Sequence, residues 1–258
     1  MDYQTLDCAT ESGIATITLN RPDVLNALNG LMRAELRHAV TAAGESARVV
    51  VLTGAGRAFC SGQDLGDAPD VTRLNLDQVL RDEYHPMLRA IVDCPVPVIA
   101  AVNGTAAGAG ANLALAADVV IAAESAVFIQ AFARIGLMPD AGGTWMLPRL
   151  VGQARALGAA LFAERIPAPQ AADWGMIWEA VPDPVFDTHW RTRAAQLAQG
   201  PTLAFRQIRE AMRESWRNDL ETQLTREAER QGACGKTRDF REGVLAFTEK
   251  RPASFEGR

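Results

Sequence analysis

Lysine is almost absent from this sequence: the only two, Lys236 and Lys250, lie near the C-terminus, and arginine supplies the remaining positive charge. The formal net charge is −5. This balance disfavours nucleic acid as a partner, because contacts with a phosphate backbone need a basic face. A small polyphosphate ligand remains possible, since it needs only a few local cations and backbone N–H groups.

Cysteine and histidine are scarce and scattered. The four cysteines contain no CxxC pair, and the three histidines form no cluster. Zinc sites and disulfide frameworks both require such spacing, so neither is expected. We predict reduced thiols in a cytoplasmic protein and no metal.

Long hydrophobic runs are missing as well. The longest apolar stretch, 97–123, is interrupted by Asn103, Asn112, Asp118 and several glycines. A membrane helix would not carry those polar groups without partners. The N-terminal residues also lack the basic-then-apolar layout of a signal peptide. We therefore expect no membrane partner.

The patterns that are present indicate an α/β protein. At 258 residues and 48% hydrophobic composition, the chain can bury one sizeable core. Apolar or alternating runs predict strands, and the segments between them have helical periodicity, which favours parallel strands joined by crossovers. The predicted strands are 13–20, 48–54, 97–104, 118–123 and 126–130; the predicted helices between them are 75–93, 108–116, 143–151 and 153–163.

The C-terminal part has a different pattern. From about residue 184 only helices are predicted, at 186–199, 202–215, 217–231 and 238–249. We therefore divide the chain into a core, 1–183, and a helical region, 184–258. The polar stretch 66–75 is predicted to be a mobile loop.

Two glycine-rich turns follow predicted strands, at 54–65 and 102–118. The first begins GxGxxF, but a dinucleotide-binding turn should open directly into a helix, and this one does not. The second contains Gly104, Gly108 and Gly110, which could serve tight helix packing. Alternatively, backbone N–H groups from both turns could converge on one oxygen and stabilise an enolate.

Together these segments resemble the crotonase family, also called enoyl-CoA hydratase/isomerase. The resemblance implies a spiral of ββα units, a C-terminal helical trimerisation region, and assembly as trimers or dimers of trimers. It also implies an acyl-CoA thioester substrate, no separate cofactor, and two backbone N–H groups around the thioester oxygen, here those of Gln63 and Ala109. The matching segments are 19–29, 50–65, 97–110, 117–128, 135–152 and 242–255.

The catalytic carboxylates of the family's hydratases are not present. Their two glutamates correspond to Asn112 and Phe132 here, and addition of water needs an acid and a base on one face of the double bond. An ordinary hydratase is therefore not expected.

Asp140, in LMPDAGGTW, matches the position where some isomerases and aromatic dehalogenases of the family keep a single carboxylate. By sequence alone it could also be the N-cap of the following helix. A dehalogenase would need a tryptophan at the position of Phe132. An isomerase needs only one base, and apolar neighbours such as Leu137 and Trp145 would raise the pKa of Asp140.

The segments 57–65, 106–118, 135–152 and 171–181 are most similar to the group that isomerises the ring 1,2-epoxide of phenylacetyl-CoA to an oxepin. Members also shift double bonds of enoyl-CoA from the β,γ to the α,β position. We expect both activities. The alternatives are a hydratase-like enzyme, a hydrolase or dehalogenase of the same fold, and a non-catalytic acyl-CoA-binding homologue.

Further site residues follow from position in the matched segments. The predicted substrate pocket is completed by Tyr84, His85 and Leu137, beside Asn112 and Phe132, although by sequence alone a solvated surface position is favoured for Tyr84 and His85. The predicted contacts with coenzyme A are Ala27, Arg57, Ala58, Asp64, Leu65 and Lys250.

Overall fold

The computed structural model describes residues 2–66 and 75–257. The predicted mobile loop therefore lies almost wholly outside the described residues. The strands are β1 (Leu6–Glu11), β2 (Ile14–Leu19), β3 (Val49–Gly54), β4 (Ala58–Cys60), β5 (Val98–Val102), β6 (Thr105–Ala107), β7 (Val119–Ala123), β8 (Val127–Ile129), β9 (Ile166–Pro167) and β10 (Glu179–Val181).

The helices of the core lie between these strands. They are η1 (Pro22–Val24), α1 (Gly30–Ser46), α2 (Leu76–Val79), the π-helical turn η3 (Leu80–Tyr84), α3 (His85–Val92), α4 (Ala109–Leu115), η4 (Ala131–Ile135), α5 (Gly143–Phe162) and α6 (Ala168–Asp173). The C-terminal helices are α7 (Asp183–Ala198), α8 (Thr202–Ser215), α9 (Leu220–Cys234) and α10 (Arg238–Glu249). α5 changes direction at Gly152, whose φ of 78° is not helical.

Two sheets organise the core. One has the order β1-β2-β3-β5-β7-β10 and the other β4-β6-β8-β9. β2, β3, β5, β7 and β10 run parallel, while β1 is antiparallel to β2. Each pair β3–β4, β5–β6 and β7–β8 gives its first strand to the larger sheet and its second to the smaller one, and helices follow. The predicted spiral of ββα units is confirmed.

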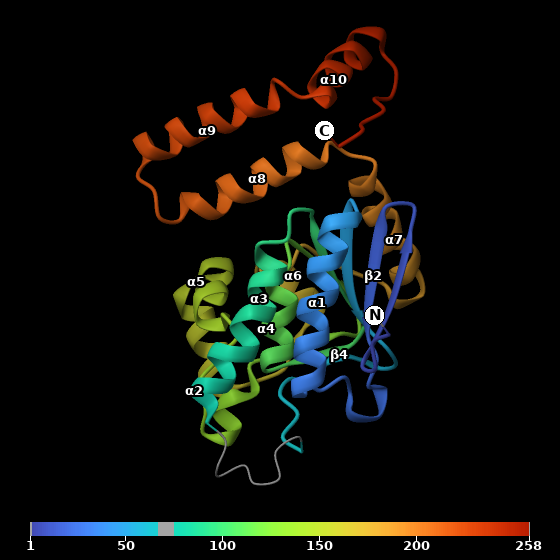
Figure 1. The fold of residues 1–258 in the computed structure, drawn as a ribbon. Coiled ribbons are helices and arrows are strands. Elements are labelled where there is room, and N and C mark those ends of the chain that lie inside the picture. The colour runs from blue at the N-terminus through green and yellow to red at the C-terminus, as the bar shows by residue number, and fades with distance from the viewer. Residues whose placement is uncertain (1, 67–74, 258) are drawn as a thin grey trace.

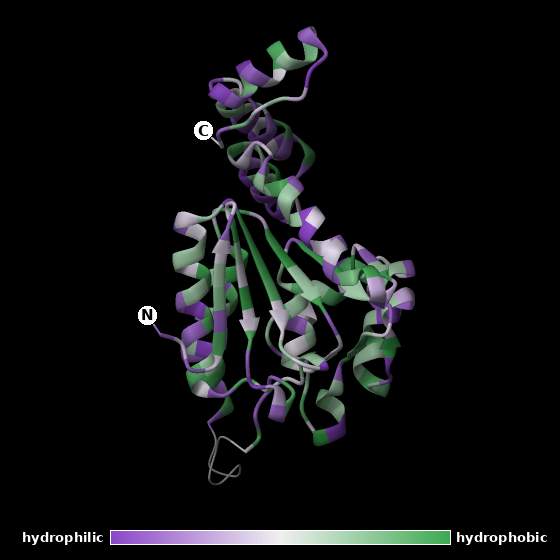
Figure 2. Cartoon of the chain, turned by 90° about the vertical axis from the view of Figure 1, so that its right-hand side faces the viewer, coloured by the Kyte–Doolittle hydropathy of each residue, from purple (hydrophilic) through white to green (hydrophobic). Residues whose placement is uncertain are grey.

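Apolar residues hold this core together. The central strands β3, β5 and β7 are largely buried, with Val49 to Leu52 fully so. Figure 2 shows the strands of the large sheet as mostly hydrophobic and flanked by helices. Burial on both faces explains why these strands appear in the sequence as continuous apolar runs. None of the helices described is both long and apolar enough to cross a membrane.

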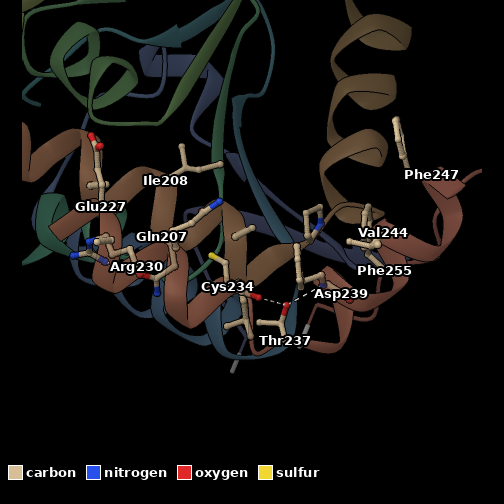
Figure 3. A pocket seen from close by; sticks show the side chains of 18 of the residues that line it. Gln207, Ile208, Glu227, Arg230, Cys234, Thr237, Asp239, Val244, Phe247 and Phe255 are labelled. Atoms are coloured by element: carbon tan, nitrogen blue, oxygen red, sulfur yellow. Dashed lines mark hydrogen bonds between the residues drawn. The ribbon is translucent and has the colours of Figure 1, made fainter. Parts of the chain in front are cut away.

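The helices α8, α9 and α10 project from the core (Figure 1). Their apolar side chains line a groove of ≈ 930 Å³ between the three helices, which includes Ile208, Val244 and Phe247 (Figure 3). The groove is formed by the helical region alone and is separate from the glycine turns of the core.

Candidate active site

The two predicted oxyanion donors follow neighbouring strands. Gln63 comes after β4 and Ala109 begins α4 after β6, and β4 pairs with β6 in parallel. Gly62 has a φ of +99°, and a side-chain Cβ there would lie 2.8 Å from the Ala107 carbonyl oxygen and 3.4 Å from the Ala109 nitrogen. Only glycine permits so close an approach with this φ. The second turn is therefore packed directly against the first.

The N–H of Gln63 points away from the segment of Leu28, with which Gln63 forms a β-bridge. Leu28 donates to the Gly62 carbonyl at 2.8 Å and accepts from the Asp64 N–H at 3.1 Å, so Gln63 stands between two paired groups. Among the described residues, neither Gln63 N–H nor Ala109 N–H donates a hydrogen bond to the protein. Both donors are thus available for a substrate oxygen, as an oxyanion site requires.

Asp140 lies close to the second donor. The side chain of Asn112, in the first turn of α4, donates from Nδ2 to the Asp140 carbonyl oxygen at 2.8 Å. Burial raises the pKa of the Asp140 carboxyl from 3.8 to about 6, in the predicted direction. Its Oδ1 is buried and has no hydrogen-bond partner within the described chain.

Asp140 is not a helix cap. The N-cap of α5 is Gly142, and no side chain caps that helix. The carboxylate therefore has no capping role in this structure. A half-buried carboxylate whose pKa is raised and whose Oδ1 has no partner is typical of a functional group.

Tyr84 is buried, which excludes the surface alternative for this residue. Its hydroxyl donates to Gln63 Oε1 at 2.5 Å. Burial raises the pKa of Tyr84, the guanidinium of Arg33 lowers it, and the charge of Asp140 raises it further. Tyr84 thus contacts the side chain of the first predicted oxyanion donor, and it lies on a π-helical turn of the kind found at functional sites.

Arg33 was not expected here, because the helical pattern of α1 places it outside the apolar stripe. It is nevertheless buried, and its Nη1 contacts Gln63 Oε1 at 3.1 Å and the Leu28 carbonyl at 2.7 Å. Its Nε donates to Glu83 at 2.8 Å. A buried arginine is stable only with such partners, and none of them is adjacent in sequence.

The remaining pocket candidates differ in solvent exposure. Phe132 is buried, and its ring lies 3.8 Å from where a Cβ on Gly108 would be, so it packs against the second oxyanion turn. Leu137 is partly exposed at the approach to Asp140. His85 is exposed, and its charge acts on Asp77 on the outer helix face. The part of His85 in the substrate pocket stays a prediction.

Most of the predicted contacts for coenzyme A gather around the first turn. Ala27 and Ala58 are buried, Arg57 and Leu65 are exposed, and Asp64 forms an ion pair with Arg21 at 2.8 Å and accepts from Gly66 N–H. Asp64 therefore organises the turn. Asn26, absent from the predicted set, is fully buried and donates to the carbonyls of Ala55 and Ala58.

Lys250 does not join this group within one chain. The C-terminal segment is tied to Arg48, which precedes β3 and donates to the Phe255 carbonyl at 3.0 Å. Arg57 lies beyond the opposite end of β3. That strand has 6 residues, so its two ends are about 20 Å apart. Lys250 therefore lies apart from the other predicted contacts in the described chain, and its contact with coenzyme A stays a prediction.

No group of three or more His, Cys, Asp or Glu side chains that could hold a metal ion occurs in the described ranges. The expectation that no metal or separate cofactor takes part stays a prediction. The candidate chemistry comes from Asp140 and from backbone N–H groups.

A family model described as enoyl-CoA hydratase/isomerase matches residues 9–258. The chain is 62% identical over 258 residues, all of both chains, to a Rhodobacter capsulatus protein named "Probable enoyl-CoA hydratase". It is 45% identical to the 1,2-epoxyphenylacetyl-CoA isomerase of Escherichia coli, covering 96% of this chain and 97% of that protein.

Solved structures agree with the sequence comparisons. The crystal structure of enoyl-CoA hydratase from Bacillus anthracis superposes with a TM-score of 0.91 at 34% identity, covering 99% of this chain and 100% of that one. The family model, the relatives and the fold all point to the same family. The chain therefore belongs to the enoyl-CoA hydratase/isomerase family.

Proposed function

We propose that this protein is an acyl-CoA isomerase that uses Asp140 as its single base. The observation that carries the proposal is the state of that residue: its carboxylate is half-buried, its Oδ1 has no hydrogen-bond partner in the described structure, and its backbone carbonyl is bonded to Asn112 of the helix that begins at Ala109. Its pKa of about 6 leaves it mostly ionised at neutral pH while making it a stronger base than an exposed aspartate.

The first proposed reaction moves a double bond from the β,γ to the α,β position of an enoyl thioester. The thioester oxygen accepts hydrogen bonds from the N–H groups of Gln63 and Ala109. Asp140 removes the α-proton, and the electron pair of that C–H bond forms an enolate whose charge those donors stabilise. Asp140 then returns the proton to the γ-carbon, which leaves the conjugated product and restores the carboxylate.

The second proposed substrate is the ring 1,2-epoxide of phenylacetyl-CoA, which opens to an oxepin. The reaction named for the relative at 45% identity supports it. Like the double-bond shift, an isomerisation adds no water and releases no group, so it needs no second carboxylate. The same oxyanion site and Asp140 serve both substrates.

Hydration is the competing reaction, since the relative at 62% identity has a hydratase name. Adding water requires a second group to hold and activate it. The positions that match the hydratase glutamates hold an amide, Asn112, and a phenyl ring, Phe132. The aromatic dehalogenases use a tryptophan at the second position, so dehalogenation is disfavoured too. A non-catalytic role leaves the unpaired Oδ1 of Asp140 unexplained.

We further propose that the protein is a cytoplasmic homo-oligomer, a trimer or a dimer of trimers. The exposed apolar side chains of α8 to α10 support this assembly, because patches of that kind mark association surfaces. Coenzyme A arrives with the substrate, and Ala27, Arg57, Ala58, Asp64 and Leu65 are the proposed contacts within one chain.

The test is the substitution Asp140→Asn, assayed with a 3-enoyl-CoA by the absorbance of the conjugated product. Loss of a general base lowers a rate by roughly 10²- to 10⁴-fold, so we expect isomerisation to fall at least about a hundredfold while acyl-CoA still binds. Asp187→Asn, on the exposed face of α7, is the matched control and should keep the wild-type rate. A near wild-type rate for Asp140→Asn would disprove the proposed function.

A further inference from the structure

The turn that carries Asp140 has an unfavourable backbone conformation. Two consecutive residues after the aspartate, Ala141 and Gly142, have left-handed φ values of 47° and 80°. Glycine adopts this region freely, but alanine does so at a cost. Such strain persists only where the surroundings hold it, and it is common at active sites. Something must therefore fix this turn.

The hydrogen bond that lowers the pKa of the Asp140 carboxyl comes from the backbone of the same residue, so it does not link the turn to another element. The carboxyl Oδ1 has no partner in the described structure. The backbone carbonyl of Asp140, by contrast, accepts two hydrogen bonds, from Gly143 N–H at 2.8 Å and from Asn112 Nδ2 at 2.8 Å. The first belongs to the turn itself. Asn112 is the side chain that ties the turn to another element, α4.

Asn112 is itself held on both sides. It is fully buried, and Gln130 Nε2 donates to its Oδ1 at 2.9 Å. A Cβ on Gly143 would lie only 2.3 Å from Asn112 Nδ2, so the amide fills the space that a side chain at 143 would need. Because Nδ2 must face the Asp140 carbonyl, Oδ1 faces Gln130, and this fixes the orientation of both amides.

We propose that Asn112, supported by Gln130, is a positioning residue that holds the strained turn and thereby places the Asp140 carboxylate against the substrate. This inference rests on the proposed function. Asn112, which matches a hydratase glutamate, would then have a different role in this protein. Its amide acts through Asp140 and does not exchange protons with the substrate. It also explains the glycine at 143 of the motif PDAGGTW.

The test is a double-mutant cycle on isomerisation of a 3-enoyl-CoA, with Asn112→Ala, Asp140→Asn and the double variant. Misplacing a reacting group by about 1 Å can cost roughly 10²-fold in rate. We expect Asn112→Ala to lower kcat by about 10- to 100-fold with little change in KM. In the Asp140→Asn background the same substitution should have almost no further effect, because no base remains to be positioned.

Two further variants separate positioning from stability. Thr5→Val removes a buried hydrogen bond to Glu35 in another part of the core and should lower the unfolding midpoint while kcat stays unchanged. Gln130→Met removes only the supporting donor, so it should lower kcat in the same direction and by less than Asn112→Ala, and it serves as the test if that variant fails to fold.

The outcomes are distinct. If Asp140→Asn is inactive but Asn112→Ala and Gln130→Met keep the wild-type kcat, the positioning role is overturned and the proposed function stands. Equal losses from Asn112→Ala in both backgrounds would also overturn it. If Asp140→Asn itself keeps the wild-type rate, the proposed function fails.

Discussion

Asp140 lies in a turn fixed by close contacts, whereas α8 and α9, both described throughout, contain no buried residue. Around Asp140, glycines at 142 and 143 admit neighbouring atoms at contact distance. On the C-terminal helices, Met212 and Phe247 are 67% and 87% exposed. The two regions thus differ in packing: a single chain packs the turn of Asp140 closely, whereas it leaves apolar side chains of the C-terminal helices exposed.

The polar contacts of the two regions differ in the same way. The side-chain amides of Asn112 and Gln130 are fixed by single, specific hydrogen bonds inside the core. The helices α8 and α9 are joined instead by Arg230, which pairs with Glu210 and Glu214 at 2.5 and 2.7 Å. Partly exposed ion pairs add little stability. The candidate chemistry therefore resides within one chain, and the helical region is suited to covering by another copy.

The largest expected effect concerns hydration, which tests whether the fixed site can change its chemistry. We expect crotonyl-CoA to be hydrated very slowly, because no water-activating pair is present. Asn112→Glu should not create that activity, since Phe132 still occupies the position of the second hydratase glutamate, and the longer side chain meets Gly143 and loses the donor to the Asp140 carbonyl. It should instead lower isomerisation at least about tenfold.

The measurement is the loss of enoyl absorbance during hydration, with isomerisation assayed in parallel. Turnover of crotonyl-CoA by the wild type at roughly tens per second, a rate common for dedicated enzymes, would contradict the isomerase assignment. Efficient hydration by Asn112→Glu alone would show that this site is less constrained than its contacts indicate.

The core was predictable from the sequence where burial leaves a strong pattern. β3, β5 and β7 are buried on both faces and appear as continuous apolar runs, so each was placed to within two residues. β4 and β6 are three residues long and lie inside glycine turns, too short for any periodicity to show. β1 was missed because five of its six residues are exposed.

The site was predictable where one residue type carries the chemistry. Asp140, Gln63 and Ala109 were predicted from motif position; the structure packs the turns of Gln63 and Ala109 together and bonds the Asp140 carbonyl to α4. Arg33 and Gln130 were missed because their partners lie 30 and 18 positions away in the sequence, at Gln63 and Asn112. Contacts of that separation depend on the fold, and a helical pattern alone places Arg33 on the solvent face.

An effect of intermediate size is expected on assembly, which tests whether the helical region joins copies of the chain. Light scattering at micromolar concentration should give about three or six times the mass of one chain, because the exposed apolar faces of α8 to α10 need cover. Met212→Glu should lower that mass by placing a charge on such a face. Leu31→Glu, on the outer face of α1, makes the same change outside the helical region and should leave the mass unaltered. A monomeric wild type would refute the proposed assembly.

The smallest expected effect is on the pH dependence of stability, which should have opposite signs for Asp140 in the core and for a carboxylate of the helical region. Burial raises the pKa of Asp140 from 3.8 to about 6, so between those values the folded protein binds more protons than the unfolded chain. Stability from this group is present below the lower value and is lost as pH rises through about 6. Asp140→Asn does not titrate there. It should therefore gain stability relative to the wild type at about pH 8, by a few degrees in Tm, and lose that advantage near pH 4.

Glu242, on α10, provides a control of opposite sign. The Arg251 side chain and the Ser254 N–H hold its pKa at about 2, below its usual 4.5, so its contribution is present above the unfolded value and is lost as pH falls. Glu242→Gln should therefore be less stable than the wild type at about pH 8, with a difference that shrinks in acid. Thermal unfolding of the three proteins across this pH range tests both signs. If Asp140→Asn differs from the wild type by the same Tm at every pH, the carboxylate of Asp140 is solvated in the folded protein, and the strengthened base on which the isomerase proposal depends is lost with it.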